Sequence, residues 1–327
     1  MGRLLVVVTD SVFPNLDPAR EVLAEIDADL KLVSEPDSEA IASATRDADG
    51  ILVTYAKISA DMIRQMSRCR VISRFGIGVD NVDLAAATAA GIVVTRVPDY
   101  CLEEVADHTL ALLLTLARKV TAANTHAHGG RWGLSGLVPM HRLRGRILGL
   151  VGFGQIPQMV APRAKAFGLR VITYDPYVEQ AVLNGAGVDG VDLNELIATS
   201  DFVSIHTPLT PVTRGMFAAE VFKQMKSEAF LINTARGPIV DEIALAEALD
   251  RGDIAGAALD VLPEEPPNGS PLFGRHNVVL TPHVSFYSVE SLVDLQRRAA
   301  REVVRALSNE NTRNPVNPEA LQHRSAR

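Results

Sequence analysis

Cysteine and aromatic residues are scarce in this chain of 327 residues, which has two cysteines, one tryptophan and 5% aromatic residues. Two cysteines, Cys69 and Cys101, are too few for a disulfide framework, so we expect a protein of the reducing cytoplasm. An excess of basic residues is also lacking, since the net charge is −7 and the pI is near 5.6. This balance argues against a broad nucleic-acid-binding face.

Long hydrophobic runs, repeats and low-complexity tracts are absent as well. The apolar run at residues 4–8 ends in Thr9-Asp10, so we interpret it as a strand and expect neither a signal peptide nor a membrane span. The chain has 47% hydrophobic and 22% charged residues. Its length and composition predict a globular protein with two domains of ordinary size.

Residues 148–175 follow the order of a dinucleotide-binding unit. A short apolar strand at 148–151 leads into a glycine turn, a helix at 158–167 and a second strand at 169–174 that ends in Asp175. The turn reads Gly152-Phe153-Gly154-Gln155-Ile156-Pro157. Gly152 permits a tight turn because glycine accepts positive φ. Gly154 lets the backbone approach a pyrophosphate at the helix N-terminus.

Asp175 predicts which dinucleotide binds. It lies 21 residues after Gly154 (175 − 154), where a carboxylate can hold both ribose hydroxyls and repel a 2′-phosphate, so we expect NAD rather than NADP. Pro157 stands in the place of the third glycine, and proline is tolerated in a first helical turn because its missing N–H is unpaired there anyway. The alternative is a purely structural glycine turn, which the register of strand, helix and acid disfavours.

Strands alternate with helices along most of the chain, which predicts α/β architecture with parallel sheets. The expected strands are 4–8, 31–33, 50–54, 71–73, 92–95, 148–151, 169–174, 202–206, 229–233, 255–259 and 278–280, the last six forming one doubly wound sheet. The expected helices are 19–26, 38–45, 59–66, 102–120, 158–167, 193–198, 218–225, 242–249 and 288–307, with a short alanine-rich one after residue 83. We expect an irregular stretch at 121–146 and a loose tail after Ser308.

Three features in the first half of the chain each allow two interpretations. The helix at 102–120 is apolar nearly all round, which is typical of a core helix or of a subunit interface. The turn at Gly76 and Gly78 could hold an anion on its N–H groups or be an ordinary glycine turn. His126 and His128 could bind a metal, but no cysteine or acidic partner lies nearby in the sequence, so we favour a solvated loop and expect no metal site.

Residues suited to catalysis follow the strands of the second sheet, at the edge where ligands bind in such folds. These strand-end groups are His206-Thr207-Pro208, Thr234-Ala235-Arg236, Asp260 and Thr281-Pro282-His283. A guanidinium at Arg236 could hold a substrate carboxylate through two hydrogen bonds. His283 is suited to proton transfer near neutral pH, and Glu265, 18 residues earlier (283 − 265), could fix its tautomer.

Taken together, these motifs resemble the NAD-dependent D-2-hydroxyacid dehydrogenase family over nearly the whole chain. The matching segments are RFGIGVDNVD (74–83), VADHTLALLL (105–114), GFGQIP (152–157), YDP (174–176), HTPLT (206–210), NTARGPIVDE (233–242), LDVLPEEPP (259–267) and TPH (281–283). RAKAFG (163–168), YDPY (174–177) and HVSFYS (283–288) are most similar to the branch of the C-terminal-binding protein corepressors, and residues 76–92 also to phosphoglycerate dehydrogenases.

The resemblance implies a role for each matching residue. His283 would be the general acid in reduction and the base in oxidation, Glu265 its partner and Arg236 the carboxylate anchor. The implied substrate contacts are Arg74, Gly76, Ile77, Gly78 and Phe286, the last standing where the corepressor branch often has tryptophan. The implied cofactor contacts are Gly152, Gly154, Gln155, Ile156, Asp175, His206, Thr207, Pro208, Thr213, Thr234, Ala235 and Asp260. Gln155 and Pro157 depart from the family's usual Arg and Gly, which bears on cofactor affinity more than on its identity.

The resemblance also implies the architecture and two alternative functions. A Rossmann NAD domain at 101–287 would be inserted into a flavodoxin-like substrate domain made of 1–100 and 288–327, with a homodimer formed through 102–145. The first function is reversible hydride transfer between NAD(H) and a small 2-keto or 2-hydroxy acid, giving the D isomer. The alternative is an NAD(H)-sensing dimeric scaffold with little or no turnover.

Overall fold

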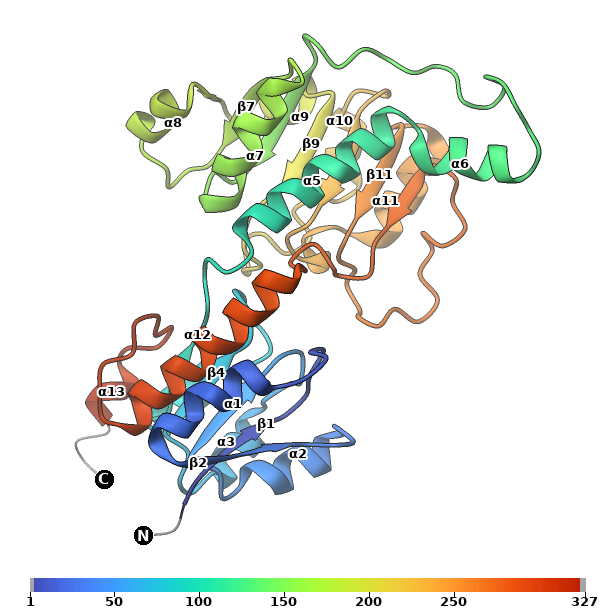
Figure 1. The fold of residues 1–327 in the computed structure, drawn as a ribbon. Coiled ribbons are helices and arrows are strands. Elements are labelled where there is room, and N and C mark those ends of the chain that lie inside the picture. The colour runs from blue at the N-terminus through green and yellow to red at the C-terminus, as the bar shows by residue number, and fades with distance from the viewer. Residues whose placement is uncertain (1–2, 324–327) are drawn as a thin grey trace. The chain divides into compact units, whose positions relative to one another are not determined.

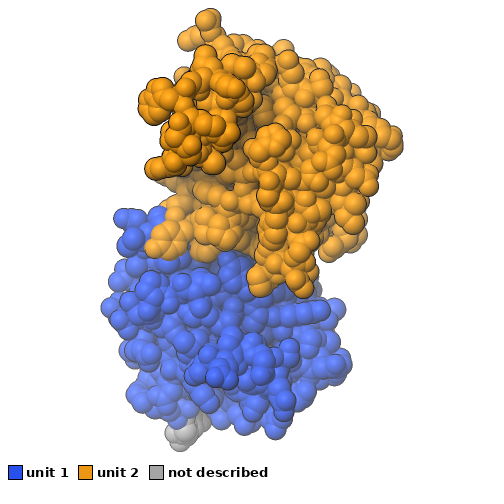
Figure 2. All heavy atoms as spheres, turned by 90° about the vertical axis from the view of Figure 1, so that its right-hand side faces the viewer, with its two compact units in different colours: residues 1–100, 288–327 blue, residues 101–287 orange. Residues whose placement is uncertain are grey.

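The computed structural model describes residues 3–323 and divides into two compact units (Figures 1 and 2). Unit 1 comprises Met1–Tyr100 and Ser288–Arg327, blue in Figure 2, and unit 2 comprises Cys101–Tyr287, orange in the same figure. Unit 2 is therefore an insertion in the sequence of unit 1, and each unit has its own sheet and its own core.

Unit 1 contains a five-stranded sheet in the order β2-β1-β3-β4-β5, with every pair of neighbours parallel. Its strands are β1 (Leu4–Val8), β2 (Ala28–Leu32), β3 (Gly50–Val53), β4 (Val71–Arg74) and β5 (Val93–Thr95). Its helices are α1 (Asp17–Leu23), η1 (Ala24–Ile26), α2 (Ser38–Thr45), α3 (Ala60–Gln65), α4 (Leu84–Ala89), α12 (Val289–Leu307) and α13 (Ala320–His323). This strand order is that of flavodoxin-like sheets.

Helices cover both faces of the unit 1 sheet. On one face, α2, α3 and α4 pack their apolar side chains against alternate strand residues. On the other face lie α1 and α12, and Gly50 of β3 is small enough for Val303 of α12 to approach to 3.0 Å of the position where a Cβ would stand. A capping box between Ser288 and Ser291 begins α12, because each side chain hydrogen-bonds the backbone N–H of the other residue.

Unit 2 contains a seven-stranded sheet in the order β12-β11-β10-β9-β6-β7-β8, again with all neighbours parallel. Its strands are β6 (Ile147–Val151), β7 (Arg170–Tyr174), β8 (Asp189–Gly190), β9 (Phe202–Ile205), β10 (Phe230–Asn233), β11 (Gly256–Leu259) and β12 (Val278–Leu280). The order reverses between β6 and β9, as in a Rossmann fold. The two sheets confirm the predicted fold class.

The helices of unit 2 are α5 (Leu102–Ala117), α6 (Val120–His128), α7 (Gln155–Ala166), α8 (Gln180–Ala186), α9 (Leu193–Thr199), α10 (Ala219–Gln224), η2 (Gly237–Ile239) and α11 (Glu242–Arg251). Most of them lie on the two faces of its sheet, whereas α6 projects from the end of α5. α5 and α7 run side by side over one face and bury their apolar side chains there (Figure 1). The apolar character of α5 is explained by this burial in the core of its own unit.

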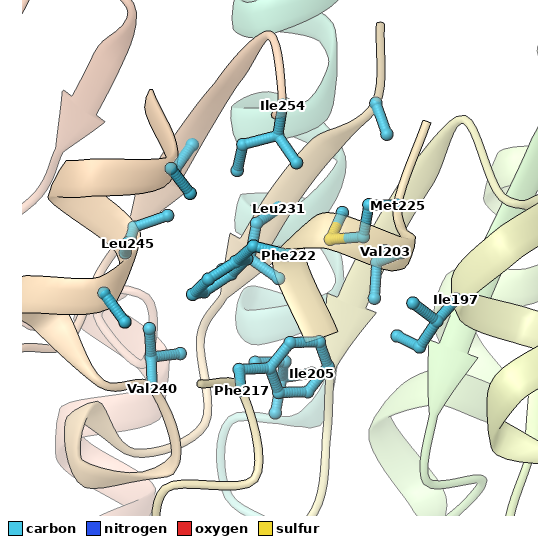
Figure 3. Packing of buried hydrophobic residues seen from close by; sticks show 14 of the residues in the cluster. Ile197, Val203, Ile205, Phe217, Phe222, Met225, Leu231, Val240, Leu245 and Ile254 are labelled. Atoms are coloured by element: carbon cyan, nitrogen blue, oxygen red, sulfur yellow. The ribbon is translucent and has the colours of Figure 1, made fainter. Parts of the chain in front are cut away.

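The opposite face of the unit 2 sheet carries the core drawn in Figure 3. Ile197 of α9, Phe222 of α10 and Leu245 of α11 meet strand residues such as Val203 and Leu231, and all five are at most 2% exposed. Side chains on both faces of every central strand are buried, which explains why the strands of this sheet are continuous apolar runs in the sequence.

Several local expectations were wrong. The second sheet has seven strands rather than six, because the two-residue β8 is too short and too polar to show an apolar pattern. Residues 121–146 are not irregular throughout, since α6 covers Val120–His128. The expected single helix at 102–120 ends at Ala117 because Lys119 takes a left-handed conformation with φ 50°. α6 buries none of its residues, so its sequence carries no apolar stripe.

The expected loose tail is instead packed on unit 1 as far as Ala320. Asn317 is 4% exposed, and its Oδ1 accepts a hydrogen bond of 2.7 Å from the backbone N–H of Val94 in β5. The backbone N–H of Val316 donates a hydrogen bond of 2.8 Å to the carbonyl of Val94. The tail thus satisfies backbone groups of an edge strand, a role that its Asn/Pro-rich composition did not reveal.

Candidate active site

The glycine turn after β6 brings the backbone close to the space in front of α7. Gly152 has a φ of +96°, and a Cβ there would lie 3.0 Å from the carbonyl oxygen of His206. Gly154 is the N-cap of α7, and none of the described atoms lies within 4 Å of the position that its Cβ would take. The open space at Gly154 and the N–H groups of the first turn of α7 fit a pyrophosphate.

The helix begins three residues earlier than expected, at Gln155, so Pro157 is its third residue and is buried. The first four N–H groups of a helix have no intrahelical partner, and the proline therefore removes no hydrogen bond at this position. Pro157 is compatible with the turn.

Asp175 is held at the carboxyl end of β7, next to the glycine turn. Its Oδ2 accepts a hydrogen bond of 2.7 Å from the backbone N–H of Phe153, and its Oδ1 accepts one of 2.9 Å from that of Tyr177. A negative charge fixed at this position fits a ribose diol and disfavours a 2′-phosphate.

The segment after β9 provides the other side of the glycine turn. Nε2 of His206 lies 2.9 Å from Oγ of Ser204, and burial lowers the pKa of His206 to about 3, so its ring is neutral at pH 7. Oγ1 of Thr207 is buried without a hydrogen-bond partner among residues 3–323, while its methyl group faces Gly152. Thr213 donates to the carbonyl of Pro208 at 2.6 Å. The orphan hydroxyl fits a site that a polar ligand completes.

The turn after β10 carries Thr234, Ala235 and Arg236. The side chain of Asn233 pins this turn, because its Oδ1 accepts from Ala235 N at 2.9 Å and its Nδ2 donates to the Arg236 carbonyl at 2.9 Å. Nη1 of Arg236 donates to the Ala235 carbonyl at 2.7 Å. Position 237 requires a glycine, because a Cβ there would lie 2.0 Å from the carbonyl carbon of Leu262. The guanidinium is thus anchored at the carboxyl edge of the sheet.

His283 and Glu265, which the sequence analysis expected to be partners, lie in direct contact. Nδ1 of His283 lies 2.6 Å from Oε2 of Glu265, whose other oxygen accepts from Leu262 N at 2.9 Å. The two side chains are 22% and 32% exposed. The ring of Phe286 stands edge-on to the imidazole, with 6.1 Å between ring centroids. The pair is fixed at one end and remains accessible to a small molecule.

Asp260 holds the loop on which His283 stands. Its carboxylate is buried and accepts hydrogen bonds from Oγ1 of Thr281 at 2.5 Å, from Val284 N at 3.0 Å and from Ser285 N at 2.9 Å. Its carbonyl accepts from His283 N at 2.8 Å. His283 itself has a φ of 51°, a conformation that is uncommon for a residue with a side chain. Four hydrogen bonds around the histidine keep it there.

Two residues of α5 support this edge of the sheet, although their sequence segment suggested no role for them. Nε2 of His108 lies 3.0 Å from Oγ1 of Thr281 and 3.6 Å from a carboxylate oxygen of Asp260. Oγ1 of Thr109 lies 3.1 Å from Oγ1 of Thr234, and both residues are buried. Polar residues on an otherwise apolar helix are the signal that could have identified them.

The predicted substrate residues of unit 1 lie at the end of β4. Arg74 is its last residue, and Nη1 donates to the Phe75 carbonyl at 2.7 Å. A Cβ on Gly76 would lie 1.0 Å from that nitrogen, so the arginine side chain requires a glycine here. The N–H of Gly76 already donates to the Arg74 carbonyl at 2.9 Å. The amides of Ile77 and Gly78 are then the ones predicted to meet a carboxylate.

The structure groups the predicted residues by unit. Arg236, Glu265 and His283 follow β10, β11 and β12, which are neighbours in one sheet, so the three stand at one edge of unit 2. All predicted cofactor residues belong to the same unit, whereas the predicted substrate residues Arg74, Gly76, Ile77 and Gly78 belong to unit 1.

Residues 3–323 contain no group of three or more His, Cys, Asp or Glu side chains arranged to hold a metal ion. His126 and His128 lie on α6. Within the same range, every helix is too short or too polar to span a lipid bilayer.

Comparison with known proteins places these features in a family. Residues 110–285, more than half of the chain, match the family model of the D-isomer specific 2-hydroxyacid dehydrogenase, NAD binding domain. A relative named D-3-phosphoglycerate dehydrogenase from Methanocaldococcus jannaschii is 38% identical over 314 residues, which are 95% of this chain and 59% of the relative. The chain thus spans well under two thirds of the length of this curated relative.

Solved structures agree over almost the whole length of both chains. The TT0316 protein from Thermus thermophilus is 36% identical with a TM-score of 0.86, covering 96% of this chain and all of that one. A D-lactate dehydrogenase from Aquifex aeolicus, solved with NAD and lactic acid, is 27% identical with a TM-score of 0.86, covering 96% and 99%. The match of its NAD-binding domain, together with these full-length likenesses, shows that this chain belongs to the D-isomer specific 2-hydroxyacid dehydrogenases, NAD-binding oxidoreductases.

Proposed function

We propose that this chain transfers a hydride between NAD(H) and a small 2-keto or 2-hydroxy acid and that the hydroxy acid has the D configuration. The observation that carries the proposal is the 2.6 Å pair of His283 and Glu265 at the carboxyl edge of the NAD-binding domain. NAD, when bound, supplies the hydride donor or acceptor. The residues of the chain supply the proton and the charges that orient the acid.

The proton is assigned to His283. The Glu265 carboxylate holds Nδ1–H of the ring and stabilises its protonated form, as a carboxylate does in other histidine pairs. Nε2 then gives a proton to the keto oxygen during reduction, and takes one from the hydroxyl during oxidation. Arg236 is assigned to the substrate carboxylate, because a guanidinium matches a carboxylate with two parallel hydrogen bonds. Arg74, Gly76, Ile77, Gly78 and Phe286 are assigned to the remaining substrate contacts.

Cofactor binding is assigned to the glycine turn and the strand ends beside it. Gly152, Gly154, Gln155 and Ile156 would face the pyrophosphate and Asp175 the ribose. The segment after β9 (His206, Thr207, Pro208 and Thr213) and the residues Thr234, Ala235 and Asp260 would complete the site. The open space at Gly154 and the orphan hydroxyl of Thr207 support this assignment.

The enzyme assignment is tested by NADH oxidation with a panel of 2-keto acids. The panel contains glyoxylate, hydroxypyruvate, 2-ketoisocaproate, phenylpyruvate and, because of the relatives named D-3-phosphoglycerate dehydrogenase, 3-phosphohydroxypyruvate. We expect turnover with NADH and little with NADPH, and a product of D configuration. The variant His283→Ala should lose turnover by a factor of about 10²–10⁴ while its affinity for NADH stays within a few-fold.

A matched histidine provides the control. His276 is exposed on the loop before β12, so His276→Ala should turn over at the wild-type rate. Wild-type turnover in His283→Ala would contradict the catalytic assignment. Negligible turnover across the panel, with dimerisation that depends on NADH, would instead favour the NAD(H)-sensing scaffold.

We further propose that the protein acts as a homodimer through the 102–145 region and works in the cytoplasm. Val120, Trp132, Leu134 and Val138 are exposed by 52%, 94%, 67% and 59%, which is a high density of exposed apolar side chains within one segment. The buried thiols of Cys69 and Cys101 suit a reducing compartment.

A further inference from the structure

Three strand ends of unit 1 bear on which acid the enzyme accepts. In the sheet, Val8 of β1 pairs with Leu52 of β3, and Val53 pairs with Arg74 of β4, so the segments that follow these strands leave the sheet at one edge. Ligands of open parallel sheets bind at this edge. The predicted substrate residues of unit 1 stand there, and the inference below rests on the proposed function.

Asp10 occupies backbone donors that an anion would use. Its Oδ1 accepts from Thr54 N at 3.0 Å, and its Oδ2 accepts from Tyr55 N at 2.6 Å. The hydroxyl of Thr9 donates to the same carboxylate at 2.7 Å. Free amides after a strand are a common place for a phosphate, but here they are already paired with a carboxylate. The partly buried Asp10 also adds a negative charge to this edge, which repels an anion.

Apolar and aromatic side chains follow the same three strands. The rings of Phe13 and Phe75 are buried and form an edge-to-face pair with centroids 4.8 Å apart. Val12 is 47% exposed and Tyr55 is 41% exposed. The backbone that carries Tyr55 is fixed on both sides, because Nδ2 of Asn81 donates to the carbonyls of Thr54 at 3.2 Å and Ala56 at 2.9 Å. A preformed surface of this kind suits an uncharged substituent.

Cations at this edge are few. Arg74 lies over Gly76 beside the loop that is assigned to the substrate carboxylate. Lys57 follows Tyr55 by two residues, and Arg96 follows β5; both are exposed. A phosphorylated acid carries a dianionic group besides its carboxylate, and these two side chains would have to bind it.

We propose that the acid used by this enzyme carries an uncharged, apolar substituent on its third carbon, packed against Val12 and Tyr55, and that phosphorylated 2-keto acids are excluded. Asp10 excludes the phosphorylated acids, and Tyr55 contacts the apolar substituent. Burying an apolar group against such a surface favours the matching substrate, whereas an unpaired dianion beside a carboxylate is disfavoured.

The test compares kcat/KM for phenylpyruvate, 2-ketoisocaproate, glyoxylate and 3-phosphohydroxypyruvate with NADH on the full-length protein. Phenylpyruvate and 2-ketoisocaproate carry the apolar substituent. We expect the better of these two to have a kcat/KM at least about 100-fold higher than that of 3-phosphohydroxypyruvate and at least about tenfold higher than that of glyoxylate.

Two variants separate the roles of the two residues. Tyr55→Ala should lower kcat/KM for the apolar acids by about tenfold or more, and Tyr55→Phe should retain it within about threefold. Asp10→Asn should raise the ratio of phosphorylated to apolar acid by about tenfold. Thermal melting and NADH affinity identify any variant that fails to fold, and in that case Asp10→Ser replaces Asp10→Asn.

Lys57→Ala and Arg96→Ala are the matched controls, and neither should change the ratio. The inference is overturned if 3-phosphohydroxypyruvate or glyoxylate is the best substrate, or if a control variant lowers activity on the phosphorylated acid alone. In those cases the proposed function still stands, because a 2-keto acid is turned over. Absence of turnover with every acid overturns both.

Discussion

Gly152 and Gly154 stand two residues apart and are glycines for different physical reasons. Gly152 has a φ of +96°, which side-chain-bearing residues rarely adopt, and lies against the His206 carbonyl. Gly154 has a φ of −72° and a ψ of −160°, which any residue can adopt, and it has open space in front of it. The fold requires the first glycine, and the proposed ligand requires the second.

This difference predicts opposite outcomes for two alanine variants. Gly152→Ala should destabilise the protein by about 1–3 kcal/mol because the backbone becomes strained. Gly154→Ala should unfold at the wild-type denaturant concentration but bind NADH at least about tenfold more weakly, because its methyl group occupies the space of the pyrophosphate. Chemical denaturation and a fluorescence titration with NADH measure the two effects. Wild-type NADH affinity in Gly154→Ala would remove the pyrophosphate from this position.

Pro157 shows how one residue can break a motif without breaking the structure. The proline stands where the dinucleotide fingerprint has its third glycine, but it is the third residue of α7, where no N–H is needed for the helix. The departure from the motif is therefore tolerated by the backbone.

At the scale of the element, the loop after β12 is shaped by a neighbouring strand end. Asp260 follows β11 and accepts hydrogen bonds from residues on both sides of His283, whose backbone is left-handed. Nothing in the local sequence of the loop requires that conformation. The buried carboxylate of another segment holds it, and His108 of α5 adds a third element to the arrangement.

The variant Asp260→Asn tests whether this support matters for turnover. An amide can replace only some of the accepted bonds, so the loop should loosen and kcat should fall by about 10–100-fold. NADH affinity should fall as well, by about threefold or more, because Asp260 is also assigned to the cofactor site. Steady-state kinetics and an NADH titration measure the two effects. An unchanged NADH affinity would remove Asp260 from the cofactor assignment, and an unchanged kcat would contradict its role in holding the loop.

Thr281→Ser is the control for the same loop, because it keeps the hydroxyl that donates to Asp260 and removes only a methyl group. We expect kcat within about threefold of the wild type for this variant.

At the scale of the molecule, each unit has one sheet that is covered by its own helices. The exposed apolar residues between α6 and β6 belong to neither hydrophobic core. Replacing Trp132 and Leu134 by aspartate should shift the molar mass in solution from that of a dimer to that of a monomer, since charges are excluded from the core of an interface. Light scattering coupled to gel filtration measures the mass. At low protein concentration, the melting temperature of the double variant should be close to that of the wild type, because both side chains are exposed within one chain.

Ile243→Asp is the matched control for the dimer. Ile243 lies on α11 and is 67% exposed, but it lies outside the 102–145 region. This variant should keep the mass of the wild type. A monomeric wild-type protein, or an unchanged dimer in the double variant, would contradict the proposed interface.

Several features followed from the sequence alone because their causes are local or periodic. Strands buried on both faces appear as apolar runs, so the β6 strand, the turn at Gly152 and the strand that ends before Asp175 were predictable in order. The family motifs also predicted that Glu265 is the partner of His283, which the contact between them confirms, and the NAD-binding domain was recognisable from its glycine turn and acid.

Other features were decided only by tertiary contacts. β8 exists because Asp189 and Gly190 pair with β7, and the tail packs on unit 1 at Asn317 because this residue satisfies an edge strand far away in sequence. The pairing of Asp10 with the amides of Thr54 and Tyr55 joins residues 44 and 45 positions apart. Such contacts leave no periodic pattern, because the energy comes from hydrogen bonds between segments that only the folded sheet brings together. The sequence therefore determined the class of chemistry, and the tertiary structure decided how His283 is held and how Asp10 pairs with the amides of Thr54 and Tyr55.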